Sequence, residues 1–243
     1  IKRSKKKINK ILVKKKNHKS IYFDDYSELE NFLNKKKFDV FINFATHYKN
    51  NHSSDDLEKM IKANILFPNF VLDKSIKNIK KFITFGTMME YSGTKFYKPQ
   101  NLYSSTKKAF DQIMEYYKIN YKHCSFHNIK LYESFSFNDV RKKIIPEIFK
   151  SIKLKCKIKI INKNLKLNIV AAEDINSFLI KLINQKQKSS NFLLRSQKDI
   201  KILDLIKKIQ KTKNLRYEIK KSKTINNLPK KINKHTTINL KRN

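Results

Sequence analysis

Tyr103 and Lys107 lie four residues apart in the sequence NLYSSTKKAF, which spans residues 101–110. On an α-helix, residues i and i+4 project from one face, so a lysine ammonium can lie beside a tyrosine phenol. A nearby positive charge favours the ionised phenol and lowers its pKa from about 10 toward working pH. In a helical setting, Tyr103 therefore has the chemistry of a general acid and base.

Chance matches to this spacing are frequent in a chain so rich in lysine. Eleven tyrosines and 51 lysines among 243 residues predict about 2.3 accidental Tyr-x-x-x-Lys pairs, and the chain has three. The other two are Tyr91/Lys95, in an expected loop, and Tyr217/Lys221, in an expected short strand. Only the pair that begins at Tyr103 falls on an expected helix, and this context separates it from chance.

Thr87 follows Gly86 at the end of the apolar segment KKFITFG, residues 80–86. If this segment is a strand of a parallel sheet, the Thr87 hydroxyl lies at the carboxyl edge, where open α/β folds bind ligands. There it can hydrogen-bond the same substrate oxygen that Tyr103 protonates. The alternative is a strand-end hydroxyl that caps a turn.

Short apolar runs alternate with longer amphipathic segments over the first 130 residues, which predicts β-α-β units around a parallel sheet. Pro68 is expected to kink the second helix midway. We expect strands at 19–23, 38–45, 80–86 and 125–132, and helices at 26–36, 54–76 and 102–120.

The alternation of short apolar and longer amphipathic segments ends after residue 131, where a basic segment is followed by shorter elements. Residues 1–130 are therefore predicted to form the main domain, to which 166–182 return, and residues 131–243 mainly a small α+β lobe. Within this second part we expect strands at 155–162, 191–195 and 216–220, a strand and a helix within 167–183, a helix at 199–211, and a polar tail.

The composition is that of a globular protein, with 40% hydrophobic and 12% aromatic residues. No apolar run approaches the roughly 20 residues that cross a bilayer, and no leader sequence is recognisable, so we expect a soluble cytoplasmic protein. The two cysteines, Cys124 and Cys156, lack the spacing of a disulfide framework or a zinc site. We expect no metal site.

The formal net charge of +36 raises the question of a nucleic-acid partner. Arginine, which makes bidentate contacts to guanine and phosphate, occurs only five times, and the 51 lysines are spread along the whole chain. Lys, Asn and Ile are frequent while Gly is reduced to two residues, a bias that an A/T-rich coding sequence produces. We therefore favour a solvated basic surface over a specific nucleic-acid site.

Six sequence blocks follow one another along the chain: FDVFINFATHY, IKANILFPNFVLD, FITFGTMMEY, KPQNLYSSTKKAFDQIMEYY, IKLYESFSFND and LNIVAAEDINSF. Their order resembles that of a known family, the extended short-chain dehydrogenase/reductases that act on nucleotide sugars. The similarity runs from about residue 1 to 220, and the NLYSSTKKAF block resembles most closely the deoxysugar enzymes of the CDP-abequose synthase kind.

The resemblance implies a Rossmann-type, doubly wound parallel sheet with a small substrate lobe. It also implies an NAD(P)-dependent epimerase, dehydratase or reductase of nucleotide sugars, in a pathway such as lipopolysaccharide O-antigen synthesis, with a homodimer as the assembly. The implied catalytic set is Thr87, Tyr103 and Lys107. The implied substrate contacts are Met88, Glu133, where many relatives carry Asn, and Arg141.

The implied cofactor site begins at Asp25, which matches the carboxylate that receives the adenine amino group. The loop Phe44-Ala45-Thr46 would lie along the cofactor, Leu131 would flank the nicotinamide, and Lys107 would also hold the nicotinamide ribose. Arg3 lies at the position where it could contact the 2′-phosphate of NADP, so we slightly favour NADP over NAD as the cofactor. From the residues alone, Asp25 can equally be a helix N-cap and Arg141 a surface cation.

The sequence departs from the family pattern in its glycines. The Gly-rich turn that brings backbone N–H groups to a pyrophosphate is absent, and the chain begins at Ile1 without methionine. We therefore expect a fragment, preceded in the natural gene by about 30 residues that carry a strand, a Gly-x-x-Gly-x-x-Gly turn and a helix. Two alternatives stay open: a non-catalytic sugar- or nucleotide-binding relative of the same fold, and a basic nucleic-acid-binding protein.

Overall fold

The computed structural model describes residues 23, 25–136, 139, 143–219 and 228–240. The predicted strand at 19–23 lies outside this range except for its last residue, and Arg3 and Arg141 lie outside it entirely. Within the described range, no helix is long and apolar enough to cross a bilayer.

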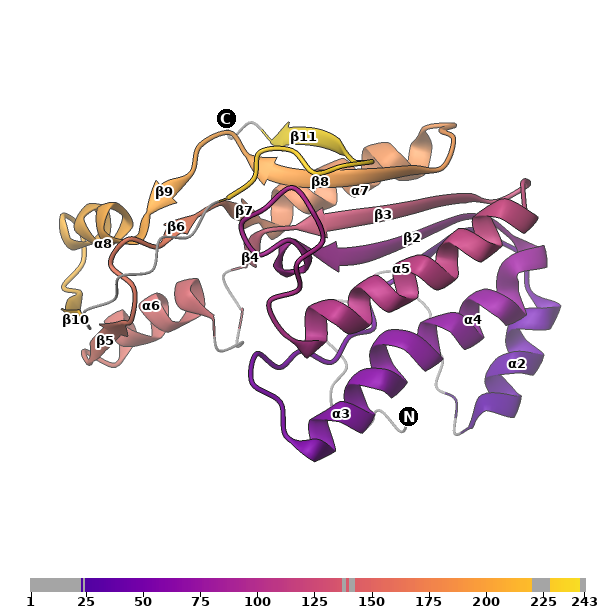
Figure 1. The fold of residues 1–243 in the computed structure, drawn as a ribbon, viewed down its shortest axis with the longest axis horizontal. Coiled ribbons are helices and arrows are strands. Elements are labelled where there is room, and N and C mark those ends of the chain that lie inside the picture. The colour runs from indigo at the N-terminus through magenta and orange to yellow at the C-terminus, as the bar shows by residue number, and fades with distance from the viewer. Residues whose placement is uncertain (1–22, 24, 137–138, 140–142, 220–227, 241–243) are drawn as a thin grey trace, which may run out of the picture.

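The main sheet has five parallel strands in the order β1-β2-β3-β8-β11. Figure 1 labels β2, β3, β8 and β11 of this sheet. This arrangement confirms the predicted α/β, Rossmann-like fold. Among the described residues, β1 and β11 are the two edges of the sheet. The strands are β1 (Phe38–Asn43), β2 (Ile79–Thr87), β3 (Ser125–Leu131), β8 (Ser190–Ser196) and β11 (Thr236–Leu240).

Helices cover both faces of this sheet, because its central strands carry buried apolar residues on each face. On one face, Phe82 and Phe126 pack against Phe110 of α5, in a core that α4 also joins (Figure 1). On the other face, Ile83 and Ile129 pack against α7. The helices of this body are α2 (Tyr26–Lys35), α3 (Ser54–Ile61), α4 (Phe67–Ser75), α5 (Leu102–Asn120) and α7 (Ala172–Asn184).

The helix predicted at 54–76 is continuous but not uniform. Between α3 and α4 lies a π-helical turn, η2 (Lys62–Leu66), in which the Phe67 N–H donates to the Lys62 carbonyl five residues back. Pro68 follows directly and has no N–H to donate to the turn before it. A widened turn therefore lies directly before Phe67 and Pro68, in the helix where the sequence predicted a kink.

A small lobe lies beyond the carboxyl ends of the main strands (Figure 1). Its core contains Ile148 of α6, Ile160 of β5, and Ile202 and Ile206 of α8. Its elements are α6 (Ile144–Lys153), β5 (Lys157–Ile160), β6 (Lys166–Leu167), β9 (Ile200–Lys201), α8 (Ile202–Gln210) and β10 (Arg216–Ile219). Strand β5 pairs with β10 in parallel and β6 pairs with β9 in antiparallel orientation, while β4 (Glu133–Phe135) pairs with β7 (Ile169–Ala171) between lobe and body.

The part of the chain that returns to the main sheet is longer than the predicted 166–182. Strands β8 and β11 both join the sheet, although they come from the half assigned mainly to the lobe. Strand β11 lies in the segment expected to be a polar tail. Its five residues are all exposed or half-buried, and only Ile238 and Leu240 among them are apolar. Helix α6 was also missed, inside the segment described only as basic.

Candidate active site

The predicted catalytic residues sit at the carboxyl edge of the sheet. Thr87 is the last residue of β2, and Tyr103 and Lys107 lie in the first two turns of α5, which packs against β2. Asn101 fixes the start of that helix, because its side chain accepts a hydrogen bond from the Ser104 N–H at 3.0 Å. The structure thus confirms the helical setting of the Tyr103/Lys107 pair.

Thr87 begins a short 3₁₀ turn, η4 (Met88–Glu90). Its hydroxyl oxygen accepts a hydrogen bond from the Met89 N–H at 3.2 Å, and its own N–H donates to Glu90 Oε1 at 3.1 Å. The capping role proposed as the alternative is therefore real. It does not exclude substrate binding, because a hydroxyl that accepts one bond still has its proton to donate.

Tyr103 is half-buried, and its ring packs edge-on against that of Tyr48, with centroids 4.9 Å apart. The Lys143 ammonium lies 5.9 Å from the Tyr48 ring centroid and 3.3 Å from Glu133 Oε1. This chain of contacts brings Glu133, predicted as a substrate contact, close to the surroundings of Tyr103. The sequence analysis missed Lys143 and Tyr48, and nothing in their local sequence sets them apart.

Lys107 is 6% exposed and lies beneath the surface of the site. Burial lowers the pKa of its ammonium to about 8, and repulsion from Lys130 acts in the same direction. The carboxylates of Glu90 and Asp111 oppose this and favour the charged form. Lys107 is therefore a cation whose proton is held less tightly than that of a surface lysine.

The loop after β1 is tied to the π-helical turn by Asn64, which is fully buried. Its Oδ1 accepts from the Thr46 hydroxyl at 3.1 Å and from the His47 N–H at 2.8 Å. Its Nδ2 donates to the His47 carbonyl at 3.0 Å and to the Thr106 hydroxyl at 2.9 Å. Asn64 thus joins the predicted cofactor loop to α5, one residue before Lys107. The signal for it was a polar residue in the apolar stripe of KANILFP.

The other predicted cofactor residues are spread along the same edge. Phe44 is 63% exposed and stacks on Phe85, and the Ala45 N–H donates to Asn43 Oδ1 at 3.0 Å. Leu131 ends β3.

Asp25 caps helix α2, accepting bonds from the Glu28 N–H at 2.9 Å and the Ser27 hydroxyl at 2.7 Å. The hydrogen bond from the Glu28 N–H is the main cause of its lowered pKa. Met88, predicted to touch substrate, is only 7% exposed and packs in a small core with Leu193 and Ile232.

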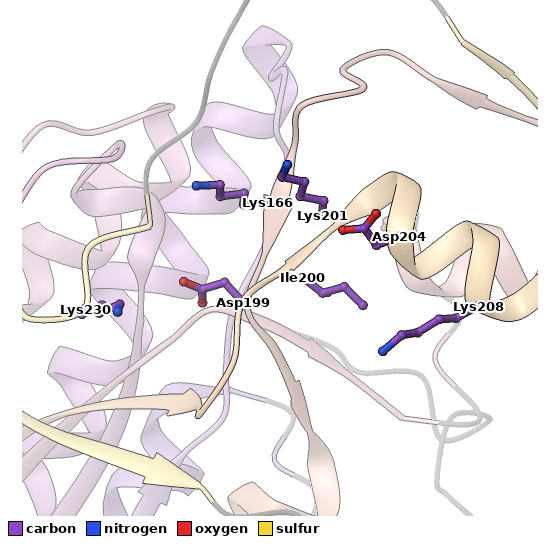
Figure 2. A pocket seen from close by; sticks show the side chains of 7 residues that line it. All are labelled: Lys166, Asp199, Ile200, Lys201, Asp204, Lys208 and Lys230. Carbon is purple, nitrogen blue, oxygen red and sulfur yellow. The ribbon is translucent and has the colours of Figure 1, made fainter.

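A cavity of about 620 Å³ opens elsewhere, between β6, β9, the start of α8 and the segment at Lys230 (Figure 2). Asp199 in its wall is held by Arg195 Nη2 at 2.6 Å and by Asn168 Nδ2 at 2.7 Å. Four lysines also line the cavity: Lys166, Lys201, Lys208 and Lys230. None of the predicted site residues that the structure describes lines this cavity.

Solved structures of nucleotide-sugar enzymes have the same fold. A UDP-glucuronic acid 4-epimerase from Bacillus cereus, in complex with UDP-glucuronic acid and NAD, superposes with a TM-score of 0.71 at 15% identity, over 89% of this chain and 69% of that chain. A UDP-glucose 4-epimerase from Thermotoga maritima with UDP-glucose gives 0.71 at 16% identity, over 82% of this chain and 70% of that one. At such identities the likeness establishes the fold alone.

Sequence comparison adds a curated relative and a family. CDP-abequose synthase from Yersinia pseudotuberculosis is 29% identical over 163 residues, which are 65% of this chain and 56% of the relative. The match thus spans little more than half of that relative's length. The model of the NAD dependent epimerase/dehydratase family matches residues 1–193. With that match over most of its length, and with the parallel sheet and helix arrangement of solved epimerases, this chain belongs to the NAD dependent epimerase/dehydratase family.

Proposed function

We propose that this chain belongs to an NAD(P)-dependent enzyme that epimerises, dehydrates or reduces a nucleotide sugar. One observation carries the proposal: a hydroxyl, a phenol and a buried ammonium, from Thr87, Tyr103 and Lys107, share the carboxyl edge of a parallel sheet. Family membership supports the same reaction class.

The residues divide the work of a proton transfer. Tyr103 takes the proton from the sugar hydroxyl, or returns it to a keto oxygen, as the carbon loses or gains hydride. The positive charge of Lys107, held in a site of low dielectric, stabilises the phenolate of Tyr103. The Thr87 hydroxyl donates a hydrogen bond to the same substrate oxygen and orients it.

A nicotinamide cofactor supplies the hydride acceptor and donor when it is bound. The exposed ring of Phe44, the ordered loop at Ala45 and Thr46 and the buried Lys107 fit its adenosine and nicotinamide ends. A glycine-rich turn for its pyrophosphate is not in the sequence, which has two glycines. The preference for NADP rests on Arg3, outside the described residues, and stays a prediction.

We propose that the substrate lies between this edge and the small lobe, with Glu133 and Lys143 on the lobe side. Lys143 is largely buried, with a side chain 13% exposed, and it is the N-cap residue directly before helix α6. A cation in this position suits a ligand with phosphate groups, such as a nucleotide sugar. The names of the solved relatives, UDP-sugar epimerases, support this substrate class.

A direct assay tests the proposal with the gene product at its full natural length. UDP- and CDP-hexoses are incubated with NAD, NADH or NADPH, and the sugars are analysed by NMR and mass spectrometry. We expect a changed configuration or oxidation state at one sugar carbon, and loss of that change in Tyr103→Phe. Binding of cofactor and nucleotide sugar with no conversion of any of them would point instead to a non-catalytic relative.

We also propose a homodimer. Exposed apolar side chains gather on the helices of one face of the sheet, which is unusual for surface that stays in water. They are Leu57, Ile61, Leu66, Tyr116 and Ile119, on α3, η2 and α5. Pairing of these helices across a two-fold axis would cover them as a four-helix interface.

A further inference from the structure

Lys130, in the last part of β3, is a fully buried lysine between two buried carboxylates. Its Nζ lies 2.8 and 2.7 Å from the two carboxylate oxygens of Glu90 and 3.3 Å from Asp111 Oδ2. Lys130 and Glu90 are each 0% exposed, and Asp111 is 3% exposed. Burial works against the charge of Lys130, but attraction to the two carboxylates outweighs it and raises its pKa.

Each carboxylate is attached to a part of the candidate active site. Glu90 Oε1, which accepts from Lys130, also accepts the Thr87 N–H at 3.1 Å. Asp111 lies one turn after Lys107 on α5, and its Oδ1 accepts from Asn128 Nδ2 at 2.6 Å. A single ammonium thus links the end of β2, which carries Thr87, to the helix that carries Lys107.

The backbone of β2 leaves room for this lysine at Gly86. A Cβ added there would overlap Lys130 Cδ and would lie 2.6 Å from its Nζ, far inside contact distance. Gly86 is not among the described residues with positive φ, so its backbone conformation does not require glycine. Glycine is required at position 86 because the Lys130 side chain occupies the space that a Cβ would fill. The chain has only two glycines.

Stability alone does not account for three buried charges. Replacing a buried ion pair by apolar side chains of similar size is often neutral or stabilising. The triad consists of one ammonium and two carboxylates, and one of these carboxylates, Asp111, lies one turn after Lys107 on α5. The charged groups that act on Lys107 are Lys130 from β3, Glu90 from η4 and Asp111 from α5.

We propose that Lys130 is a positioning residue: through Glu90 and Asp111 it holds Thr87 and Lys107 in register, and the triad controls the charge on Lys107. This inference rests on the proposed function for the catalytic role of Lys107. Lys130 itself, fully buried, does not touch substrate. Gly86 is part of the same arrangement, because its lack of a side chain leaves room for Lys130.

The test compares three variants of the full-length protein. Lys130→Met removes the positive charge, and Glu90→Gln removes a negative charge while keeping an acceptor for the Thr87 N–H. Lys108→Met is the matched control, because Lys108 also pairs with Asp111, at 3.2 Å, but from the surface side of α5. Lys107 is titrated by NMR with ¹³C-labelled lysine, its signal identified by its loss in Lys107→Arg.

We expect shifts of opposite sign in the pKa of Lys107. It rises by at least about one pH unit in Lys130→Met and falls by about as much in Glu90→Gln, because a repelling and an attracting charge are removed. The kcat of both variants falls at least about tenfold. The alkaline limb of the kcat/KM profile moves with the pKa of Lys107, and Lys108→Met behaves as wild type.

An unchanged Lys107 pKa in both variants, or full kcat in Lys130→Met, overturns the inference. If Lys130→Met does not fold, the inference is tested by Glu90→Gln alone, in which the pKa of Lys107 is expected to fall. A wild-type protein that converts no nucleotide sugar contradicts the proposed function. In that case the titration of Lys107, which needs no turnover, still tests the charge control by the triad.

Discussion

At the scale of single residues, the site combines a half-buried phenol with a buried ammonium one helical turn away. The spacing that links them occurs three times in the chain, and their place in the fold distinguishes this pair from the others. Tyr217, with the same spacing to Lys221, lies in β10 of the small lobe, at its apolar core. The two tyrosines therefore form a matched pair for mutation.

Tyr103→Phe is expected to lower kcat by at least about 10²-fold, because the substitution removes the hydroxyl that we propose as the acid and base. The Kd for NADH, measured by fluorescence, should stay near that of wild type, since the ring is kept. Tyr217→Phe serves as the control and should keep full turnover. Equal turnover of the Tyr103 variant and wild type would remove Tyr103 from the mechanism.

At the scale of elements, the π-helical turn η2 connects the loop predicted to bind the cofactor to α5, the helix that carries Tyr103 and Lys107. Such turns are frequent at functional sites, because the widened turn reorients a side chain. Here Asn64 is the side chain in question, with four hydrogen bonds to Thr46, His47 and Thr106.

Asn64→Leu, similar in size, should reduce the free energy of unfolding by about 2–3 kcal/mol, because it leaves buried partners unsatisfied. It should also weaken NADH binding, because the loop after β1 is released. Urea denaturation and fluorescence titration measure the two effects. Asn120→Leu, at the exposed end of α5, is the control and should change neither. Unaltered cofactor affinity in Asn64→Leu would show that the loop is held by other contacts.

Strand β3 carries a second buried ionisable group, His127, which is 0% exposed and stacks near Phe192. Burial is the main cause that lowers its pKa from 6.5 to about 4, and Lys81 adds repulsion. Between these pH values the unfolded chain binds a proton that the folded protein does not. Stability is therefore lost as pH falls from about 6.5 to about 4.

His127→Phe should reduce this acid sensitivity. We expect the difference in free energy of unfolding between pH 7 and pH 4.5 to shrink by about 2–3 kcal/mol relative to wild type. Urea midpoints at the two pH values provide the measurement. His52→Phe, at an exposed position before α3, should leave the difference unchanged. The same pH dependence in His127→Phe and wild type would assign it to the carboxylates instead.

At the scale of the whole molecule, helices cover both faces of the sheet, and each face has an exposed isoleucine. Ile119, on α5, and Ile180, on α7, are similarly exposed, at 64% and 60%. They lie on helices that cover opposite faces (Figure 1). Only the α5 face belongs to the proposed dimer interface.

Light scattering at micromolar concentration should therefore report a dimer for the full-length protein. Ile119→Glu should convert it to a monomer, because the charge would be buried between the paired helices. Ile180→Glu should remain a dimer. A monomeric wild type, or equal effects of the two substitutions, would contradict this interface.

The fold of the body was largely predictable, because the periodicity of apolar residues along a short segment indicates whether that segment forms a strand or a helix. Apolar runs marked β2 and β3, and the stripe on α5 marked a helix at the residues where the structure has it. The lobe was less predictable, since its elements are short. Strand β11 was not predicted from the sequence, because an edge strand that is partly exposed to solvent needs few apolar residues.

By itself, the sequence determined the parallel α/β fold, the family, and the helical placement of Tyr103 and Lys107. These depend on backbone geometry over a few residues and on the order of short blocks. Only the tertiary structure decided that Lys130 meets Glu90 and Asp111, and that Asn64 meets Thr106. Those partners are 19 to 42 residues apart, and strand register and helix packing bring them together. The burial that shifts the pKa of Lys107 arises in the same way, since it is a property of everything packed around the residue and not of its neighbours in the chain.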